Sequence, residues 1–172
     1  MWIIPCTISV LRALALAPLF FLFPAYPIAA FLVFTAGALT DALDGWLARL
    51  LNAESELGKI LDPIADKIFY LGALVVLNNI APTFLLFILA LPWETLLTVI
   101  RFRASHQTRR AANPCGKWKT TVQFCAIACM MFGAISNIST LAASGFALGL
   151  VAVPLAWMSF YAHIHPNEKA AF

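Results

Sequence analysis

The stretch DALDGWLARLLNAESELGKILDPIADK, residues 41–67, decides how the rest of this chain is interpreted. It carries four aspartates, Asp41, Asp44, Asp62 and Asp66, in or beside segments that are otherwise strongly apolar. A carboxylate inside a membrane-embedded helix is costly unless a partner compensates its charge. The stretch therefore predicts a functional site within an apolar chain.

The composition sets the class of protein. Of the 172 residues, 62% are hydrophobic and 11% are charged, which is too few charges to coat a soluble globule of this size. Apolar runs of about 20 residues, the length that spans a bilayer, recur along the sequence. Segments of this kind are expected at 8–24, 27–50, 59–79, 82–103, 118–138 and 141–163. We predict an all-α integral membrane protein with six transmembrane helices in one membrane domain, residues 1–172, and no nucleic-acid partner.

The basic residues predict the orientation of these helices. With six spans and the N-terminus inside, every lysine and arginine falls on or near one side, as cytoplasmic segments of membrane proteins require. Both termini and the segments 49–59 and 101–119 are therefore expected in the cytoplasm. We predict residence in the inner (cytoplasmic) membrane of a bacterium, with the site facing the cytoplasm.

The spacing of the aspartates predicts that they form one cluster. Asp41 and Asp44 are spaced i, i+3, and Asp62 and Asp66 are spaced i, i+4, so each pair shares a helix face. The short connection between the two helices predicts antiparallel neighbours. All four carboxylates can then meet at similar depth, about 10 Å below the connecting loop.

Three interpretations of the cluster are open. Salt bridges could compensate the charge, with Arg49, Lys59 and Lys67 nearby in the sequence. Asp62 could instead be a solvated N-cap, because Pro63 suits the first turn of a helix. A divalent cation explains four carboxylates best, and oxygen-only ligands favour Mg²⁺, Mn²⁺ or Ca²⁺. Two ions could share the four side chains.

The full pattern Asp41-x2-Asp44-Gly45-x2-Ala48-Arg49-x8-Gly58-x3-Asp62-x3-Asp66 resembles the signature of the CDP-alcohol phosphotransferase family. This resemblance implies six membrane helices, a homodimer, two Mg²⁺ or Mn²⁺ ions, and displacement of CMP from a CDP-activated substrate by an alcohol. It implies metal binding by Asp41, Asp44, Asp62 and Asp66, with Asp66 also the general base. It further implies that the CDP moiety is lined by Gly45, Ala48, Arg49 and Gly58.

Three further segments resemble bacterial phosphatidylglycerophosphate synthases. Residues 5–12, PCTISVLR, are similar to their Pro-Asn-x-x-Thr-x-x-Arg opening, with Cys6 and Ser9 as departures. Trp93-Glu94 followed by Arg101 is similar to Arg-Glu-x6-Arg, with tryptophan replacing the first arginine. Residues 116–123, GKWKTTVQ, match Gly-Lys-x-Lys-Thr-x-x-Gln. The implied substrates are CDP-diacylglycerol and sn-glycerol 3-phosphate.

The basic residues near the predicted site suit an acceptor that carries its own phosphate. Arg101, Lys117 and Lys119 are expected to bind that phosphate, although a basic loop on anionic lipid headgroups is an alternative. Glu94, an ionisable residue inside an apolar span, is expected to pair with Arg101 or another basic group. Alternative acceptors are phosphatidylglycerol, as in a CMP-forming cardiolipin synthase, and inositol phosphate. Alternatives of another class are a small ion-coupled transporter and a non-catalytic scaffold.

Overall fold

The computed structural model describes the backbone of residues 11–50, 56–78, 83–105 and 114–164, and the side chains of residues 11–40, 64–78, 83–99 and 118–161. The part described is entirely helical apart from turns. Its helices are α2 (Leu16–Leu22), α3 (Pro27–Leu50), α4 (Glu56–Leu77), α5 (Phe84–Ser105), α6 (Pro114–Ile135) and α7 (Ser139–Ile164). The predicted all-α class is confirmed, and the helices from α3 to α7 lie within about four residues of their predicted positions. Helix α2 is shorter than the segment predicted at 8–24.

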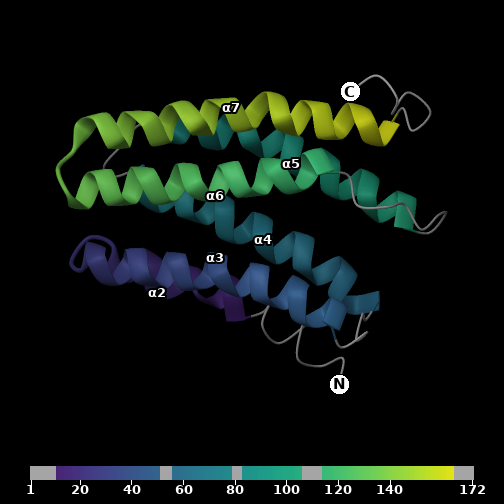
Figure 1. The fold of residues 1–172 in the computed structure, drawn as a ribbon, viewed down its shortest axis with the longest axis horizontal. Coiled ribbons are helices and arrows are strands. Elements are labelled where there is room, and N and C mark those ends of the chain that lie inside the picture. Colours follow the sequence, from purple (N-terminus) through teal and green to yellow (C-terminus); the bar gives the residue numbers. More distant parts are fainter. Residues whose placement is uncertain (1–10, 51–55, 79–82, 106–113, 165–172) are drawn as a thin grey trace.

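The helices form an elongated bundle in which successive long helices run in alternating directions (Figure 1). The most extensive pair is α6 with α7. Helix α5 packs on α4 and α7, α6 also contacts α3 and α4, and α2 contacts α3 and α4. The C-terminal end of α3 and the N-terminal ends of α4 and α6 therefore lie at the same end of the bundle (Figure 1), which is where the predicted site residues fall in the sequence.

Two helix starts differ from the sequence prediction. Helix α6 begins at Pro114 rather than near residue 118, because proline is favoured in the first helical turn, where no N–H donor is needed. Lys117 and Lys119 consequently belong to a helix rather than to the preceding loop. Helix α4 begins at Glu56, so Asp62 lies in its second turn and cannot be the N-cap.

Two helices are long and apolar enough to cross a membrane over the described residues, at Trp118–Ile135 and Ser139–Tyr161. Shorter apolar stretches occupy Leu11–Leu22, Pro27–Thr40 and Phe84–Val99.

The tight turn between α6 and α7 has a local cause. Asn137 adopts a left-handed conformation with φ of 55°, which asparagine tolerates better than most residues. The N–H of Ile138 then donates to the carbonyl of Gly133 at 2.9 Å, and the N–H of Asn137 donates to the carbonyl of Ala134 at 3.4 Å. These two bonds form a Schellman motif, which satisfies carbonyls at the end of α6 and lets α7 return along it.

Candidate active site

An aromatic cluster joins the helices that carry the aspartates. Phe34 of α3 stacks on Phe69 of α4 with ring centroids 5.5 Å apart, and Phe124 of α6 packs against both rings. Phe69 reaches α3 because residue 37 is glycine: a Cβ there would lie 2.7 Å from the Cζ of Phe69. The cluster therefore fixes how α3 and α4 are aligned along their axes.

This alignment places the four aspartate positions at matching levels. Asp44 follows Gly37 by the same number of residues as Asp62 precedes Phe69, and Asp41 and Asp66 are each about one turn from that contact. Because α3 and α4 run in opposite directions (Figure 1), equal steps along each helix reach equal heights at about 1.5 Å per residue. A cluster of the four carboxylates stays a prediction, because the side chains of Asp41, Asp44 and Asp62 lie outside the described residues.

The predicted CDP-binding residues occupy the same end of these helices. Gly45, Ala48 and Arg49 lie in the last turns of α3, and Gly58 lies in the first turn of α4. Their side chains, like those of Arg101 in α5 and Lys117 in α6, lie outside the described residues. Their predicted contacts with ligands therefore remain predictions.

Asp66 is the predicted ligand and base whose side chain the structure describes. Its Oδ1 accepts a hydrogen bond from Nη1 of Arg12, and the two groups form an ion pair. The Arg12 side chain is 1% exposed and the Asp66 side chain 26% exposed. Arg12 was not among the cationic partners predicted from the sequence, which were Arg49, Lys59 and Lys67. The position of Arg12 inside an apolar segment was the signal that could have indicated it.

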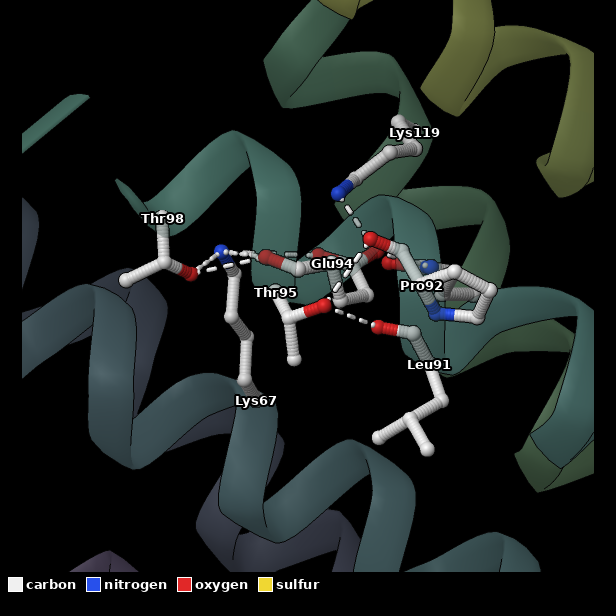
Figure 2. Close-up of polar contacts among 8 residues, drawn as sticks. Lys67, Leu91, Pro92, Glu94, Thr95, Thr98 and Lys119 are labelled. Atoms are coloured by element: carbon white, nitrogen blue, oxygen red, sulfur yellow. Dashed lines mark hydrogen bonds and ion pairs between the residues drawn. The ribbon is translucent and has the colours of Figure 1, made fainter. Parts of the chain in front are cut away.

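A second polar cluster surrounds Glu94 between α4, α5 and α6 (Figure 2). Glu94 is 2% exposed, and its Oε1 accepts hydrogen bonds from Nζ of Lys119 at 2.6 Å and from Nε2 of Gln123 at 2.8 Å. Nζ of Lys67 lies 3.8 Å from Oε2 of Glu94 and donates to the Glu94 carbonyl at 2.6 Å. The expectation that Glu94 pairs with a basic group is confirmed, with lysines as the partners.

Hydrogen bonds also fix the rim of this cluster. Lys67 donates to the hydroxyl of Thr98, which in turn donates to the Glu94 carbonyl at 2.7 Å. The buried side chain of Tyr70 lies near Glu94 and Gln123. Sequence reasoning identified Glu94 and Lys119, but it missed Lys67 and Tyr70 as their neighbours because the contacts join different helices.

Trp93 departs from the resembled Arg-Glu pattern, and the structure gives the substitution a packing role. Its ring lies edge-on to Trp157 of α7 with centroids 4.5 Å apart, and it also contacts Phe160. The side chain therefore packs in the α5–α7 contact, and Glu94 beside it takes part in the polar cluster.

Residues 2–160 match the sequence model of the family described as CDP-alcohol phosphatidyltransferase. The chain belongs to this family.

Several relatives carry more specific names. A "CDP-diacylglycerol--glycerol-3-phosphate 3-phosphatidyltransferase" of Cereibacter sphaeroides is 38% identical over 143 residues, covering 77% of this chain and 64% of the relative. A chloroplastic/mitochondrial protein of the same name from Arabidopsis thaliana is 32% identical, covering 80% and 52%. A "Cardiolipin synthase (CMP-forming)" of Oryza sativa is 30% identical, covering 77% and 46%. The chain spans roughly half to two-thirds of the length of these relatives.

Proposed function

We propose that this chain transfers the phosphatidyl group of CDP-diacylglycerol to a hydroxyl of sn-glycerol 3-phosphate, giving phosphatidylglycerol phosphate and CMP. The observation that carries the proposal is the matched heights of positions 41 and 66, and of 44 and 62, on two antiparallel helices of a family member. Two relatives named for this reaction, at 32% and 38% identity, support the choice of substrates.

Asp66 is the proposed general base. It takes the proton as the acceptor oxygen bonds to the phosphorus that carries the diacylglycerol group. The bond from that phosphorus to the oxygen of CMP breaks, and CMP leaves with the electron pair. The ion pair with buried Arg12 supports this role, because it fixes the direction of the carboxylate.

The donor set fits a divalent ion. Asp41, Asp44, Asp62 and Asp66 would hold it with carboxylate oxygens alone, which Mg²⁺ and Mn²⁺ prefer. When bound, two such ions supply charge neutralisation at the diphosphate. Gly45, Ala48, Arg49 and Gly58 are the proposed CDP contacts, and the guanidinium of Arg49 suits a phosphate.

We also propose how the enzyme lies in the membrane. The six helices would cross the bacterial inner membrane as a homodimer, with both termini and the site on the cytoplasmic side. The gathering of the basic helix ends at one end of the bundle supports this orientation (Figure 1). Lys119, with Arg101 and Lys117, would bind the phosphate of the acceptor.

The test is CMP release by the purified chain in detergent with CDP-diacylglycerol, Mg²⁺ or Mn²⁺, and one acceptor at a time. Release with glycerol 3-phosphate, and not with phosphatidylglycerol or inositol phosphate, is the expected result. Release with phosphatidylglycerol alone would favour the activity named for the rice relative. No release with any acceptor from folded protein would favour the ion-coupled transporter.

Removal of divalent metal should abolish the reaction while leaving the helices intact. Because metal ions supply several kcal/mol of transition-state stabilisation, we expect EDTA to lower CMP release by at least about 100-fold. Excess Mg²⁺ or Mn²⁺ should restore the rate, and circular dichroism recorded on the same samples should not change. Full activity after exhaustive chelation would contradict the proposed metal site.

A further inference from the structure

Lys67 connects α4 to α5 immediately beside the proposed base. Its Nζ donates to the backbone carbonyl of Glu94 at 2.6 Å and to the hydroxyl of Thr98, and it lies 3.8 Å from Oε2 of Glu94 (Figure 2). Thr98 in turn donates to the same carbonyl at 2.7 Å. Because hydrogen bonds are directional, these contacts fix where this face of α4 lies against α5.

Asp66 and Lys67 are consecutive residues of α4, so their side chains leave the helix about 100° apart. Asp66 pairs with Arg12, from the segment before α2, whereas Lys67 bonds to Thr98 of α5. Adjacent residues of α4 are therefore held from two different sides of the helix. Because the backbone joins them directly, a contact that fixes Lys67 also restricts the position of Asp66.

The ion pair with Arg12 and the contacts of Lys67 fix different properties of Asp66. The ion pair sets the direction of the carboxylate, while the rotation of α4 about its own axis sets where the carboxylate lies. The stack of Phe69 on Phe34 of α3 restrains this rotation less, because apolar contact is non-directional. The bonds from Lys67 to a carbonyl and a hydroxyl of α5 oppose the rotation directly.

A small rotation of α4 has a large consequence for a base. Side-chain ends lie on the order of 5–6 Å from a helix axis, so a rotation of roughly 20° displaces them by about 2 Å. A misplacement of about 1 Å can lower a rate about 100-fold, because the reacting atoms must start at the right separation. A contact that prevents such a rotation therefore affects the rate without touching either substrate.

We propose that Lys67 is a positioning residue for Asp66. Its hydrogen bonds to the Glu94 carbonyl and the Thr98 hydroxyl fix the rotation of α4, and thereby the place of the carboxylate that takes up the acceptor proton and binds metal. Thr98 shares this role from α5. Neither side chain needs to contact glycerol 3-phosphate or CDP-diacylglycerol. This inference rests on the proposed function, because it concerns the base of that reaction.

Thr98→Val is the sharpest test, because it removes the hydroxyl on α5, keeps the shape of the side chain and leaves Lys67 itself unchanged. We expect kcat for CMP release to fall at least about threefold, with the KM values for both substrates changed less than about twofold. Thr95→Val is the matched control, since Thr95 is exposed on the same helix and donates to the carbonyls of Leu91 and Pro92. It should leave all three constants unchanged. Equal kcat values in Thr98→Val and Thr95→Val would overturn the proposal.

Lys67→Met removes the whole contact. Glu94 keeps its bonds to Lys119 at 2.6 Å and to Gln123 at 2.8 Å, so its charge stays compensated and the bundle should fold. We expect kcat to fall at least about tenfold with nearly constant KM values, and to recover in part in Lys67→Arg, which keeps the charge. A raised acceptor KM with an unchanged kcat would overturn the proposal, because Lys67 would then bind the acceptor directly. A lower melting temperature with unchanged kcat and KM would also overturn it, because Lys67 would then be purely structural.

Binding of Mn²⁺ separates this inference from the proposed reaction, because it needs no turnover. Asp66 is a proposed metal ligand, so its displacement should weaken binding, measured from the electron paramagnetic resonance signal of free Mn²⁺ during a titration. We expect Lys67→Met to bind Mn²⁺ about tenfold more weakly than the wild-type protein, with Thr95→Val unchanged. If this difference is found but the wild-type protein releases no CMP, the proposed reaction alone fails. Equal Mn²⁺ affinities of the wild-type protein and Lys67→Met would overturn the positioning role, even in an active enzyme.

Discussion

Asp66→Asn is expected to reduce CMP release by at least about 1,000-fold, because it removes a group proposed to act as both base and metal ligand. Asparagine has nearly the same shape but cannot take up the proton of the acceptor hydroxyl. The measurement is CMP release with glycerol 3-phosphate under saturating CDP-diacylglycerol and Mg²⁺. More than a tenth of the wild-type rate in the variant would exclude Asp66 as the base.

The ion pair with Arg12 provides the control for this experiment. Asp66→Asn also weakens the bond to a buried guanidinium, which should lower the free energy of unfolding by about 1–3 kcal/mol. Arg12→Gln breaks the same ion pair and keeps the carboxylate. If Asp66→Asn loses activity because the base is removed, the Arg12→Gln variant should be at least about ten times more active than Asp66→Asn, with comparable stability. Equal losses would assign the effect to the ion pair.

The overall helical arrangement could be predicted from the sequence because it depends on local properties. Runs of apolar residues broken by turn residues indicated helices close to those observed from α3 to α7. The error at the start of α6 arose because Pro114 begins a helix before the apolar run does. Such starts are hard to predict from the sequence, because charged residues occur both in the end turns of helices and in loops.

The contacts of the site could be predicted only in part. Helical spacing places Asp62 and Asp66 on one face, but it does not indicate that Arg12, 54 residues earlier, pairs with Asp66. The same holds for Glu94, whose partners Lys67 and Lys119 lie 27 and 25 residues away. These pairings depend on how the helices cross, which is set by close contacts such as that of Phe69 with Gly37. The spacing of residues along the sequence does not indicate how the helices cross.

The second large effect is expected from Gly145→Val, at the contact between α6 and α7. A Cβ at position 145 would lie 2.7 Å from the carbonyl oxygen of Ala126 and 2.7 Å from the backbone nitrogen of Met130. Because both neighbours are backbone atoms of α6, no side-chain rotation can relieve the overlap, and the helices must separate. Small residues allow such close approach between membrane helices. We expect a loss of about 3 kcal/mol, or a melting temperature lower by roughly 6–12 °C.

Ala147→Val is the matched control, because Ala147 is exposed on the same helix. Gly145→Val should also impair catalysis, since Ala126 lies about one turn from Gln123, and a displaced α6 would move Lys119 and Gln123 away from Glu94. The acceptor KM should therefore rise in the residual folded protein, while Ala147→Val keeps the wild-type value. If Gly145→Val melts like the control, α6 and α7 are not packed as closely as the structure places them. If it melts early with an unchanged acceptor KM, the α6–α7 contact stabilises the bundle without positioning Lys119.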